Sequence, residues 1–270
     1  MLKNSASLRF SKFSEGKNKP YSVNGKFFMR YGPNSQQLGR DEIRELFHKE
    51  SLVMFDTKTN SKFSIDRDIS KKAYEIFIRL SKISPILERK KILQNLSLLV
   101  DEKIKNAGVL LFCKKVNDFF LNATVSCILF QGNDKYKIID QREFERDLYS
   151  NYQNAFSYVK SKLNTEYIIK GGPREEKLEL PEEALREAIL NAIAHRDYFS
   201  PANVQINIFQ NRVEITNPGG LIGDITVKDL FEKSIPRNRL LFGLMQRMEI
   251  VPFDTYSLFG CHFLSPSYAL

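Results

Sequence analysis

Glu187 and Asn191 are the two residues of this sequence whose types and spacing best suit chemistry. They stand four positions apart in the segment PEEALREAILNAIAHRDY (181–198). On an α-helix, side chains at i and i+4 lie one above the other on the same face. A carboxylate placed in this way can polarise a water molecule, and a carboxamide oxygen can coordinate a Mg²⁺ ion that bridges phosphates. The pair alone is a weak signal, because polar residues opposite an apolar stripe usually face water.

The segment that carries the pair has the pattern of an amphipathic helix. Its apolar residues recur with the helical period, and Glu187, Asn191 and Ala194 fall on the side opposite to them. Pro181 suits the first helical turn, and the two acidic residues that follow it suit the positive end of the helix dipole. The apolar stripe comprises Ala184, Leu185, Ala188, Ile189, Ala192 and Ile193.

Two strand-like segments and a glycine turn follow this helix. VQINIF (204–209) and RVEIT (212–216) alternate in polarity and are separated by Gln210-Asn211, which predicts a two-residue hairpin link. The turn ITNPGG (215–220) comes directly after them, and its glycines would allow a nucleotide base to approach the backbone closely. A plain turn that closes a hairpin is the alternative. The spacing between the turn and the helix favours a site.

NAIAHRDY followed by VQINIFQNRVEITNPGG resembles the GHKL-type ATP-binding module of a broad prokaryotic family. Members of this family are labelled transcriptional regulators, Schlafen AlbA-domain proteins or RecG-like helicases. The segments 93–112 and 167–198 also resemble the family, and 24–47 is similar to the later part of an AlbA-like domain. The resemblance implies that the protein uses ATP and Mg²⁺ as cofactors and that DNA is its partner.

The resemblance assigns roles to five residues of the helix and the turn. Glu187 would be the general base, and Asn191 would be the Mg²⁺ ligand and a nucleotide contact. Asn217 would fall where many GHKL proteins carry an adenine-binding aspartate, with Gly219 and Gly220 in the adjoining turn.

The sequence departs from the family pattern at both ends. Its first residues lead into the second half of the AlbA-like domain, without the acidic segment that ends in a Glu-Phe-Lys type motif. After RNRLLFGLMQRMEIV (237–251) the family continues into a phosphate loop of the G-x-G type. This sequence instead reads PFDTYSLFGCHFLSPSYAL, a segment with none of the chain's 41 basic residues. We therefore expect a truncated or frame-shifted end, weak ATP binding and almost no hydrolysis.

The formal charge of +9 is concentrated at the start of the chain. Residues 1–40 carry eight basic residues and one acidic residue, and six aromatic residues are interleaved with them. Cations contact phosphates and aromatic rings stack on exposed bases, so this segment predicts a DNA-binding surface. A flexible basic arm beside an ordinary strand is the alternative. The expected DNA contacts are Lys17, Lys19, Lys26, Arg30 and Arg40.

Composition narrows the class of protein. With 42% hydrophobic and 27% charged residues the chain can bury a core, and its longest apolar run, 107–113, is too short to span a bilayer. Cys113, Cys127 and Cys261 are widely spaced and predict neither a disulfide framework nor a zinc site, which favours the cytoplasm. No G-x-x-x-x-G-K-[ST] motif occurs, which excludes a RecG-type helicase motor.

The remaining segments predict further helices and strands. A basic pair of helices separated by Ser84-Pro85 could form a helix-turn-helix reader, although solvated basic faces are common. Strands are expected at 25–31, 107–113, 123–132 and 167–170, and helices at 40–49, 69–83, 86–99 and about 141 to 163.

These features predict an α+β protein of several parts. We expect an incomplete AlbA-like DNA-binding region (1–50), a mixed helical and strand middle region (51–164), a partial GHKL-type ATP-binding α/β sandwich (165–251) and a divergent tail (252–270). The expected function is a DNA-associated transcriptional regulator that binds ATP. The alternatives are a truncated DNA- or protein-binding relative without nucleotide function, and a Schlafen-like nuclease, which the missing N-terminal acidic residues disfavour. No membrane partner is expected, and homo-oligomerisation is left open.

Overall fold

The chain forms two compact units, Met1–Val53 and Met54–Leu270. The computed structural model describes residues 22–31, 33–49, 54–163, 165–168, 175–220 and 236–250. Most of the basic N-terminal segment and the predicted tail at 252–270 therefore lie outside the described residues. Both units contain helices and sheets, and the predicted α+β class is confirmed.

The described residues of the first unit form a three-stranded antiparallel sheet and one helix. The strands β1 (Ser22–Val23), β2 (Lys26–Tyr31) and β3 (Asn34–Gln37) follow one another in the sheet, and α1 spans Arg40–Lys49. Asn24 and Gly25 connect β1 to β2 with φ angles of 51° and 73°. Positive φ at both positions suits the strand twist of a two-residue hairpin. The predicted strand at 25–31 and helix at 40–49 are confirmed.

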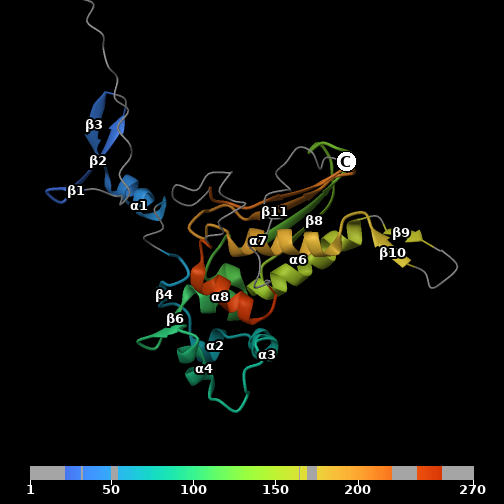
Figure 1. Cartoon of the computed structure of the whole chain (residues 1–270), viewed down its shortest axis with the longest axis horizontal. Helices are drawn as coiled ribbons and strands as arrows, with labels where there is room; N and C mark the ends of the chain where they lie inside the picture. The colour runs from blue at the N-terminus through green and yellow to red at the C-terminus, as the bar shows by residue number, and fades with distance from the viewer. Residues whose placement is uncertain are drawn as a thin grey trace, which may run out of the picture. The chain divides into compact units, whose positions relative to one another are not determined.

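The second unit is built on a four-stranded sheet with the order β12-β11-β7-β8. β11 (Val204–Ile208) and β12 (Val213–Thr216) form the predicted antiparallel hairpin. β11 runs parallel to β7 (Val125–Phe130), and β8 (Ile138–Phe144) pairs with β7 in the antiparallel direction. Two helices, α6 (Leu148–Lys162) and α7 (Glu182–Ala194), lie side by side along one face of this sheet (Figure 1).

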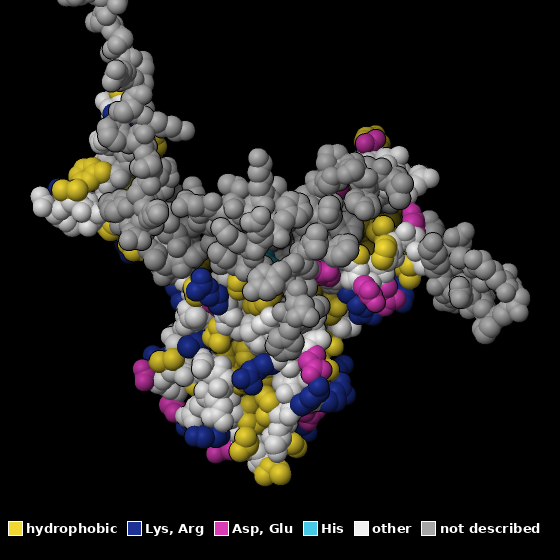
Figure 2. Space-filling model, in the orientation of Figure 1, with side chains coloured by type: hydrophobic (Ala, Val, Ile, Leu, Met, Phe, Trp, Pro, Cys, Tyr) yellow, Lys and Arg dark blue, Asp and Glu magenta, His cyan; other side chains and the backbone are white. Residues whose placement is uncertain are grey.

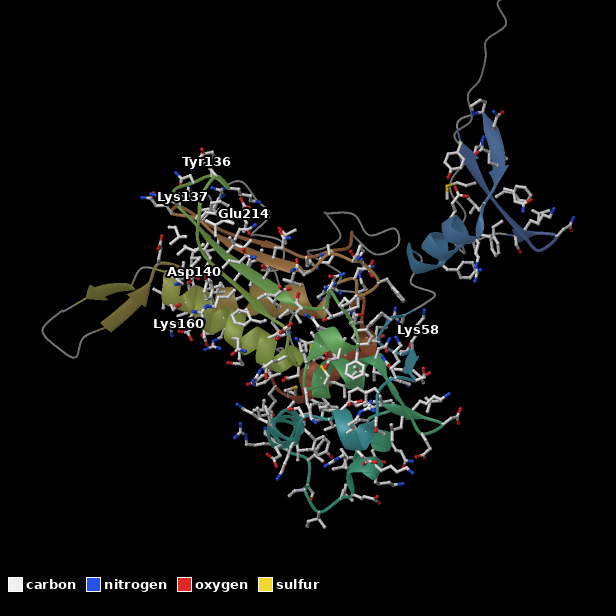
Figure 3. The ribbon with its side chains drawn as sticks, turned by 180° about the vertical axis from the view of Figure 1, so that it is seen from behind. Lys58, Tyr136, Lys137, Asp140, Lys160 and Glu214 are labelled. Atoms are coloured by element: carbon white, nitrogen blue, oxygen red, sulfur yellow. The ribbon has the colours of Figure 1, made fainter. Side chains whose placement is uncertain are left out.

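Alternation along the strands explains why the helices cover one face. Val204 and Ile206 of β11 are buried, whereas Gln205 between them is exposed, as expected when successive side chains point to opposite faces. An ion pair of 2.8 Å between Lys162 of α6 and Asp140 joins the helix to the edge strand β8. Figure 3 shows Asp140 on that strand beside α6.

Shorter elements make up the rest of the second unit, around the small sheet β4-β6-β5 and a separate hairpin of β9 and β10. Figure 2 shows basic, acidic and hydrophobic side chains interspersed on the described surface, and no single type dominates it in that view. The bounds are β4 (Thr59–Asn60), α2 (Ile65–Asp68), α3 (Lys71–Leu80), α4 (Arg89–Asn95), β5 (Leu99–Val100), β6 (Lys103–Lys105), α5 (Asn106–Phe112), η1 (Val116–Asp118), β9 (Thr165–Ile168), β10 (Glu175–Leu178) and α8 (Arg239–Arg247).

Two predictions for this unit are wrong. The segment 107–113, predicted as a strand, lies mostly in helix α5, and every residue of α5 is buried. A continuous apolar run has no period, so it cannot distinguish a buried strand from a buried helix. The helix predicted from about 141 begins instead at Leu148, where the side chain of Asp147 accepts a hydrogen bond of 2.9 Å from Ser150 N. Residues 138–144 before it form β8.

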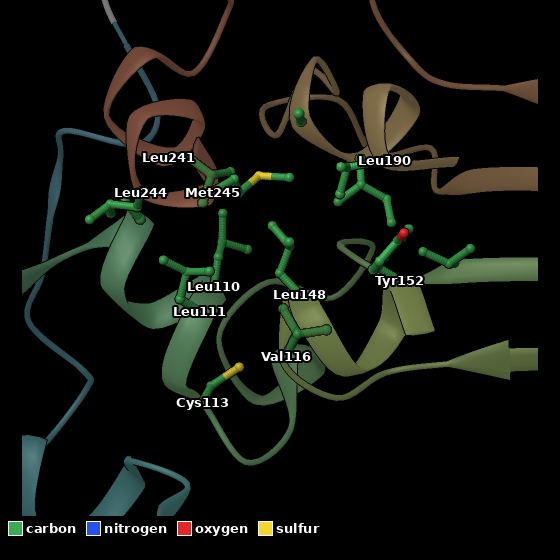
Figure 4. Close-up of a cluster of buried hydrophobic side chains, with 14 of the residues drawn as sticks. Leu110, Leu111, Cys113, Val116, Leu148, Tyr152, Leu190, Leu241, Leu244 and Met245 are labelled. Carbon is green, nitrogen blue, oxygen red and sulfur yellow. The ribbon is translucent and has the colours of Figure 1, made fainter. Parts of the chain in front are cut away.

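The hydrophobic core joins α8 to helix α5. Leu241, Leu244 and Met245 of α8 are buried, and they lie beside Leu110 and Leu111 in the cluster that Figure 4 shows. Each such side chain contributes about 1.5–3 kcal/mol when it leaves water. Arg239 is exposed, but the side of the first turn of α8 that carries Leu241 is packed in the core, and the free backbone amides there need acceptors.

A buried carboxylate supplies those acceptors. Asp56 is fully buried, and its Oδ2 accepts hydrogen bonds from Leu240 N at 2.8 Å and Leu241 N at 3.1 Å. The backbone oxygen of Asp56 accepts from Ala107 N at 3.0 Å, at the start of α5. Burial raises the pKa of this carboxyl above its ordinary value of 3.8.

We expect Asp56→Ala to lower the free energy of unfolding by about 1–2 kcal/mol, the usual loss when a helix cap is removed. Asp56→Asn should lose less, because the amide oxygen can still accept from both backbone amides. The raised pKa means that the stabilisation from this carboxyl is full below pH 3.8 and falls as the pH rises through the folded-state pKa. Urea unfolding at several pH values measures both effects. Equal losses in the two variants at every pH would contradict this role.

Candidate functional site

Helix α7 carries Glu187 and Asn191, and both residues are half-buried. The predicted helix is confirmed for Glu182–Ala194, and four residues of its expected apolar stripe are buried. Ala194, expected on the opposite side, is also fully buried. The C-terminal end of α7 is thus packed on more than its apolar stripe, so Glu187 and Asn191 stand in a partly enclosed environment. The buried stripe residues are Leu185, Ile189, Ala192 and Ile193.

His195 ends this helix and makes its side-chain contact with another helix. Its backbone amide donates to Asn191 O at 2.9 Å. Its ring packs edge-on against Phe242 of α8, with centroids 5.7 Å apart. Burial, and then the positive charge of Arg237, lower the pKa of His195 below 6.5. This imidazole is neutral at neutral pH.

Arg196 is a structural residue of the segment after α7. Its side chain is 2% exposed, and Nη2 donates to the backbone carbonyls of Asn122, Ser200 and Ala202. The guanidinium lies 4.7 Å above the ring of Tyr198. A cavity of about 10 Å³ beside it has room for about one water molecule. A nucleotide does not fit there, and the candidate site lies elsewhere.

Asp197 brings the glycine turn against the end of α7. Its backbone amide donates to Pro218 O at 2.9 Å. Gly219 has a φ of +111°, and a Cβ atom at this position would lie 2.9 Å from Cβ of Asp197. Only glycine fits this approach without a shift. A Cβ on Gly220, in contrast, would meet open space. Asn217 of the same turn is half-buried.

The structure therefore brings the turn to the C-terminal end of the helix that carries Glu187 and Asn191. The joint between them is made by Asp197, which contacts Gly219 and Pro218. The distance from Asn191 to the turn along the chain is 26 residues to Asn217, and β11 and β12 return the chain to α7.

Sequence reasoning missed two residues of this region, Arg237 and Asn238. Nη2 of Arg237 donates to Gly220 O at 2.5 Å. Asn238 is buried, and its Nδ2 donates to Ala194 O and Arg196 O, both at 2.9 Å. Asn238 stands at the N-cap position of α8, where asparagine is common, but its side chain caps the end of α7 instead. The Arg-Asn pair directly before an apolar helical pattern was the available signal.

The donor set at α7 suits a metal ion only in combination with a phosphate ligand. Among the described residues no group of three His, Cys, Asp or Glu side chains could hold a metal ion. Glu187 and Asn191 would supply at most a carboxylate and an amide oxygen. Mg²⁺ is commonly held by one or two protein oxygens, with phosphate oxygens and waters completing six ligands. The residues present therefore fit Mg²⁺ bound with a nucleotide.

Neither of the described cysteines is a nucleophile. Cys113 and Cys127 are both buried and free. Burial raises the pKa of Cys127 to about 12 and also raises the pKa of Cys113, so both remain thiols at neutral pH.

The predicted DNA contacts fall in the first unit. Lys26, Arg30 and Arg40 are exposed, with Lys26 and Arg30 on β2. Lys17 and Lys19 lie outside the described residues. Phe28 and Tyr31 on the same strand are 46% and 47% exposed, which is high for aromatic rings that would otherwise pack inward. In the described parts of the chain, no helix has the length and apolarity to cross a membrane.

Comparison with known proteins bears on the same region. The family described as "Putative ATP-dependent DNA helicase recG C-terminal" matches residues 202–255. This segment contains the hairpin, the glycine turn and Arg237-Asn238. No curated protein matches the chain.

A solved structure matches over most of the chain. It is the crystal structure of the DIP2311 protein from Corynebacterium diphtheriae, a target of the Northeast Structural Genomics Consortium. The two are 19% identical, with a TM-score of 0.62, and the match covers 84% of this chain and 46% of that one. The likeness establishes a shared fold, and the chain spans just under half the length of that protein.

We expect Gly219→Ala and Gly220→Ala to differ sharply. The new Cβ at position 219 would meet Asp197 and would require a strained positive φ, so the free energy of unfolding should fall by roughly 1–3 kcal/mol. At position 220 the methyl group enters open space, and we expect a change within about 0.5 kcal/mol. Urea unfolding of both variants tests this difference, and similar losses would show that the turn does not rest on Asp197.

Proposed function

We propose that residues 165–251 bind an adenine nucleotide together with Mg²⁺, in a protein that associates with DNA. The observation that supports this most is the joint between the glycine turn and α7. Asp197 N donates to Pro218 O at 2.9 Å, and Gly219 approaches Asp197 too closely for any side chain. A turn shaped for close backbone approach thus stands at the end of a helix with a carboxylate and a carboxamide on one face. The family match at 202–255 also supports a nucleotide.

Each residue has a role that its chemistry allows. Asn217 and the backbone at Gly220 hold the base, because the side of Gly220 where a Cβ would lie is open. Asn191 holds Mg²⁺ through its amide oxygen, and Glu187 accepts a proton from a water molecule. When bound, Mg²⁺ neutralises phosphate charge and holds the phosphates in one geometry. The neutral ring of His195 adds no positive charge at the end of α7.

Hydrolysis in this 270-residue chain is slow in our proposal. Its sequence has no G-x-G motif after Arg237-Asn238, and such a loop supplies backbone amides to the terminal phosphates. A positioned base accelerates proton transfer by about 10²–10⁴-fold, and only when the phosphate is aligned with the attacking water. We infer nucleotide binding in the micromolar to millimolar range and turnover below about 1 min⁻¹, far under the ~10 s⁻¹ of a median enzyme.

A DNA- or protein-binding role without nucleotide function is the second candidate. The exposed aromatic rings of Phe28 and Tyr31 support it, since they lie on the same short strand as the exposed cations Lys26 and Arg30. Aromatic rings between cations suit nucleic acid, because the cations contact phosphates and the rings stack on bases. In the first candidate function, by contrast, a transcriptional regulator would use both units, with the nucleotide bound in the second and DNA on the first.

Asn191→Ala should abolish the Mg²⁺-dependent part of ATP binding, because it removes the amide oxygen that holds the metal ion. Glu187→Gln should leave ATP affinity nearly unchanged and remove whatever slow turnover remains. Titration calorimetry with ATP, with and without Mg²⁺, measures the first effect. Glu183→Gln, an exposed carboxylate in the first turn of the same helix, is the matched control.

Two outcomes would reject this assignment. One is the absence of any ATP binding by calorimetry. The other is ATP binding whose Mg²⁺ dependence survives in Asn191→Ala.

Replacing Lys17, Lys19, Lys26 and Arg30 by Ala should weaken binding to every DNA duplex to a similar extent. If about four cations contact phosphates, log K should fall with log salt at a slope near −3 to −4, and the replacement should flatten it. Fluorescence anisotropy over a salt series measures the slope. The control carries Ala at four lysines of the helices α3 and α4, two of which already lie near acidic residues, Lys71 near Glu75 and Lys90 near Glu102.

That control should bind DNA nearly as the wild type does. A larger loss in the control than in the first variant would move the DNA surface to α3 and α4. The remaining two lysines of the control are Lys72 and Lys91.

A further inference from the structure

Arg237 and Asp197 pack against the same side of the glycine turn. A Cβ atom on Gly219 would lie 2.9 Å from Cβ of Asp197, 3.3 Å from Nη2 of Arg237 and 3.4 Å from its Cζ. Arg237 also donates from Nη2 to the carbonyl of the next residue, Gly220, at 2.5 Å. The guanidinium therefore hydrogen-bonds the turn at Gly220 and packs beside Gly219.

The next residue in the chain contacts the other half of the candidate site. Asn238 donates from Nδ2 to Ala194 O and Arg196 O, which are the carbonyls at the end of α7. Neighbouring Cα atoms are about 3.8 Å apart across a trans peptide. One dipeptide thus sets the separation between the turn and the helix that carries Glu187 and Asn191.

One polar group of the Arg237 side chain is buried without a partner among the described residues. Its Nε is buried and has no hydrogen-bond acceptor in the described structure. No carboxylate among the described residues forms an ion pair with it. An unpaired buried donor is destabilising, and the contacts of the guanidinium with the turn at Gly219 and Gly220 act against that loss. Its charge also reaches His195, whose pKa it lowers in addition to the effect of burial.

We propose that Arg237 is a positioning residue of the nucleotide site and holds the turn in the shape that receives the base. This inference rests on the nucleotide function proposed above. It assigns Arg237 to the base-binding half of the site, and Asn191 to the metal-binding half. Removal of the guanidinium should therefore weaken adenosine and ATP by the same factor and leave the gain from Mg²⁺ unchanged.

The test compares Arg237→Gln, Arg237→Lys and the control Arg239→Gln in the full chain. Arg239 is the exposed first residue of α8, so the control makes the same change of charge two positions away. Calorimetry with adenosine, and with ATP with and without Mg²⁺, gives the affinities. Nuclear magnetic resonance follows the amide signals of Gly219 and Gly220 and the titration of His195.

Arg237→Gln should weaken adenosine and ATP about tenfold each, the loss expected when a hydrogen bond to a charged group is broken. Arg237→Lys should restore part of that loss, and Arg239→Gln should bind as the wild type does. The pKa of His195 should rise in Arg237→Gln and stay low in Arg237→Lys.

Loss confined to ATP, or to its Mg²⁺-dependent part, would overturn the positioning role. So would unchanged affinity in Arg237→Gln. If the wild type binds neither adenosine nor ATP, the proposed function fails, and the amide signals still decide the inference about Arg237. Signals of Gly219 and Gly220 that move in Arg237→Gln but not in Arg239→Gln show that the guanidinium holds the turn, and unmoved signals show that it does not.

Discussion

One side of the first turn of α8 is buried, and the second unit depends on the hydrogen-bond partners that its backbone amides find there. Backbone amides at a helix start have no partner within the helix, and leaving them unpaired in a core is costly. Oδ2 of Asp56 accepts from two of them, although burial disfavours the charged carboxylate. Just before α8, Asn238 donates to two carbonyls at the end of α7. These hydrogen bonds join α8 to α7 and, through the backbone of Asp56, to α5.

The elements that the sequence predicts well are those with strong local signals. The hairpin at 204–216 alternates in polarity on both sides of a two-residue link, and α7 has a helical period with proline before its first residue. The segment 107–113 has neither alternating polarity nor a helical period, because all its residues are apolar. Burial on every side allows a helix as readily as a strand. β8 was missed because its sequence, IIDQREF, is mostly polar, as an edge strand with exposed side chains permits.

The candidate site, too, could be predicted from the sequence only in part. The Glu187 and Asn191 pair on α7 and the glycine turn could each be predicted from the sequence, since each has a local pattern. The contacts that bring them together could not, because Asp197, Arg237 and Asn238 act through hydrogen bonds to main-chain atoms or through close backbone approach. A carbonyl acceptor has no side-chain identity, so such a contact leaves no paired residue in the sequence. Residue patterns reveal which groups could do chemistry, and the backbone partners that place them appear only in the structure.

The parallel pairing of β7 with β11 has a consequence for how the chain is made. Val125 of β7 pairs with Val204 of β11, so about 80 further residues are synthesised before this second neighbour of β7 is available. At about 5–20 residues per second that delay is roughly 4–16 s on the ribosome. During this interval one edge of the nascent β7–β8 hairpin, with its buried residues Val125 and Cys127, has no neighbouring strand from the finished sheet. The complete sheet therefore forms late in synthesis. The growing chain is most vulnerable to association with other chains before α7 and β11 emerge from the ribosome.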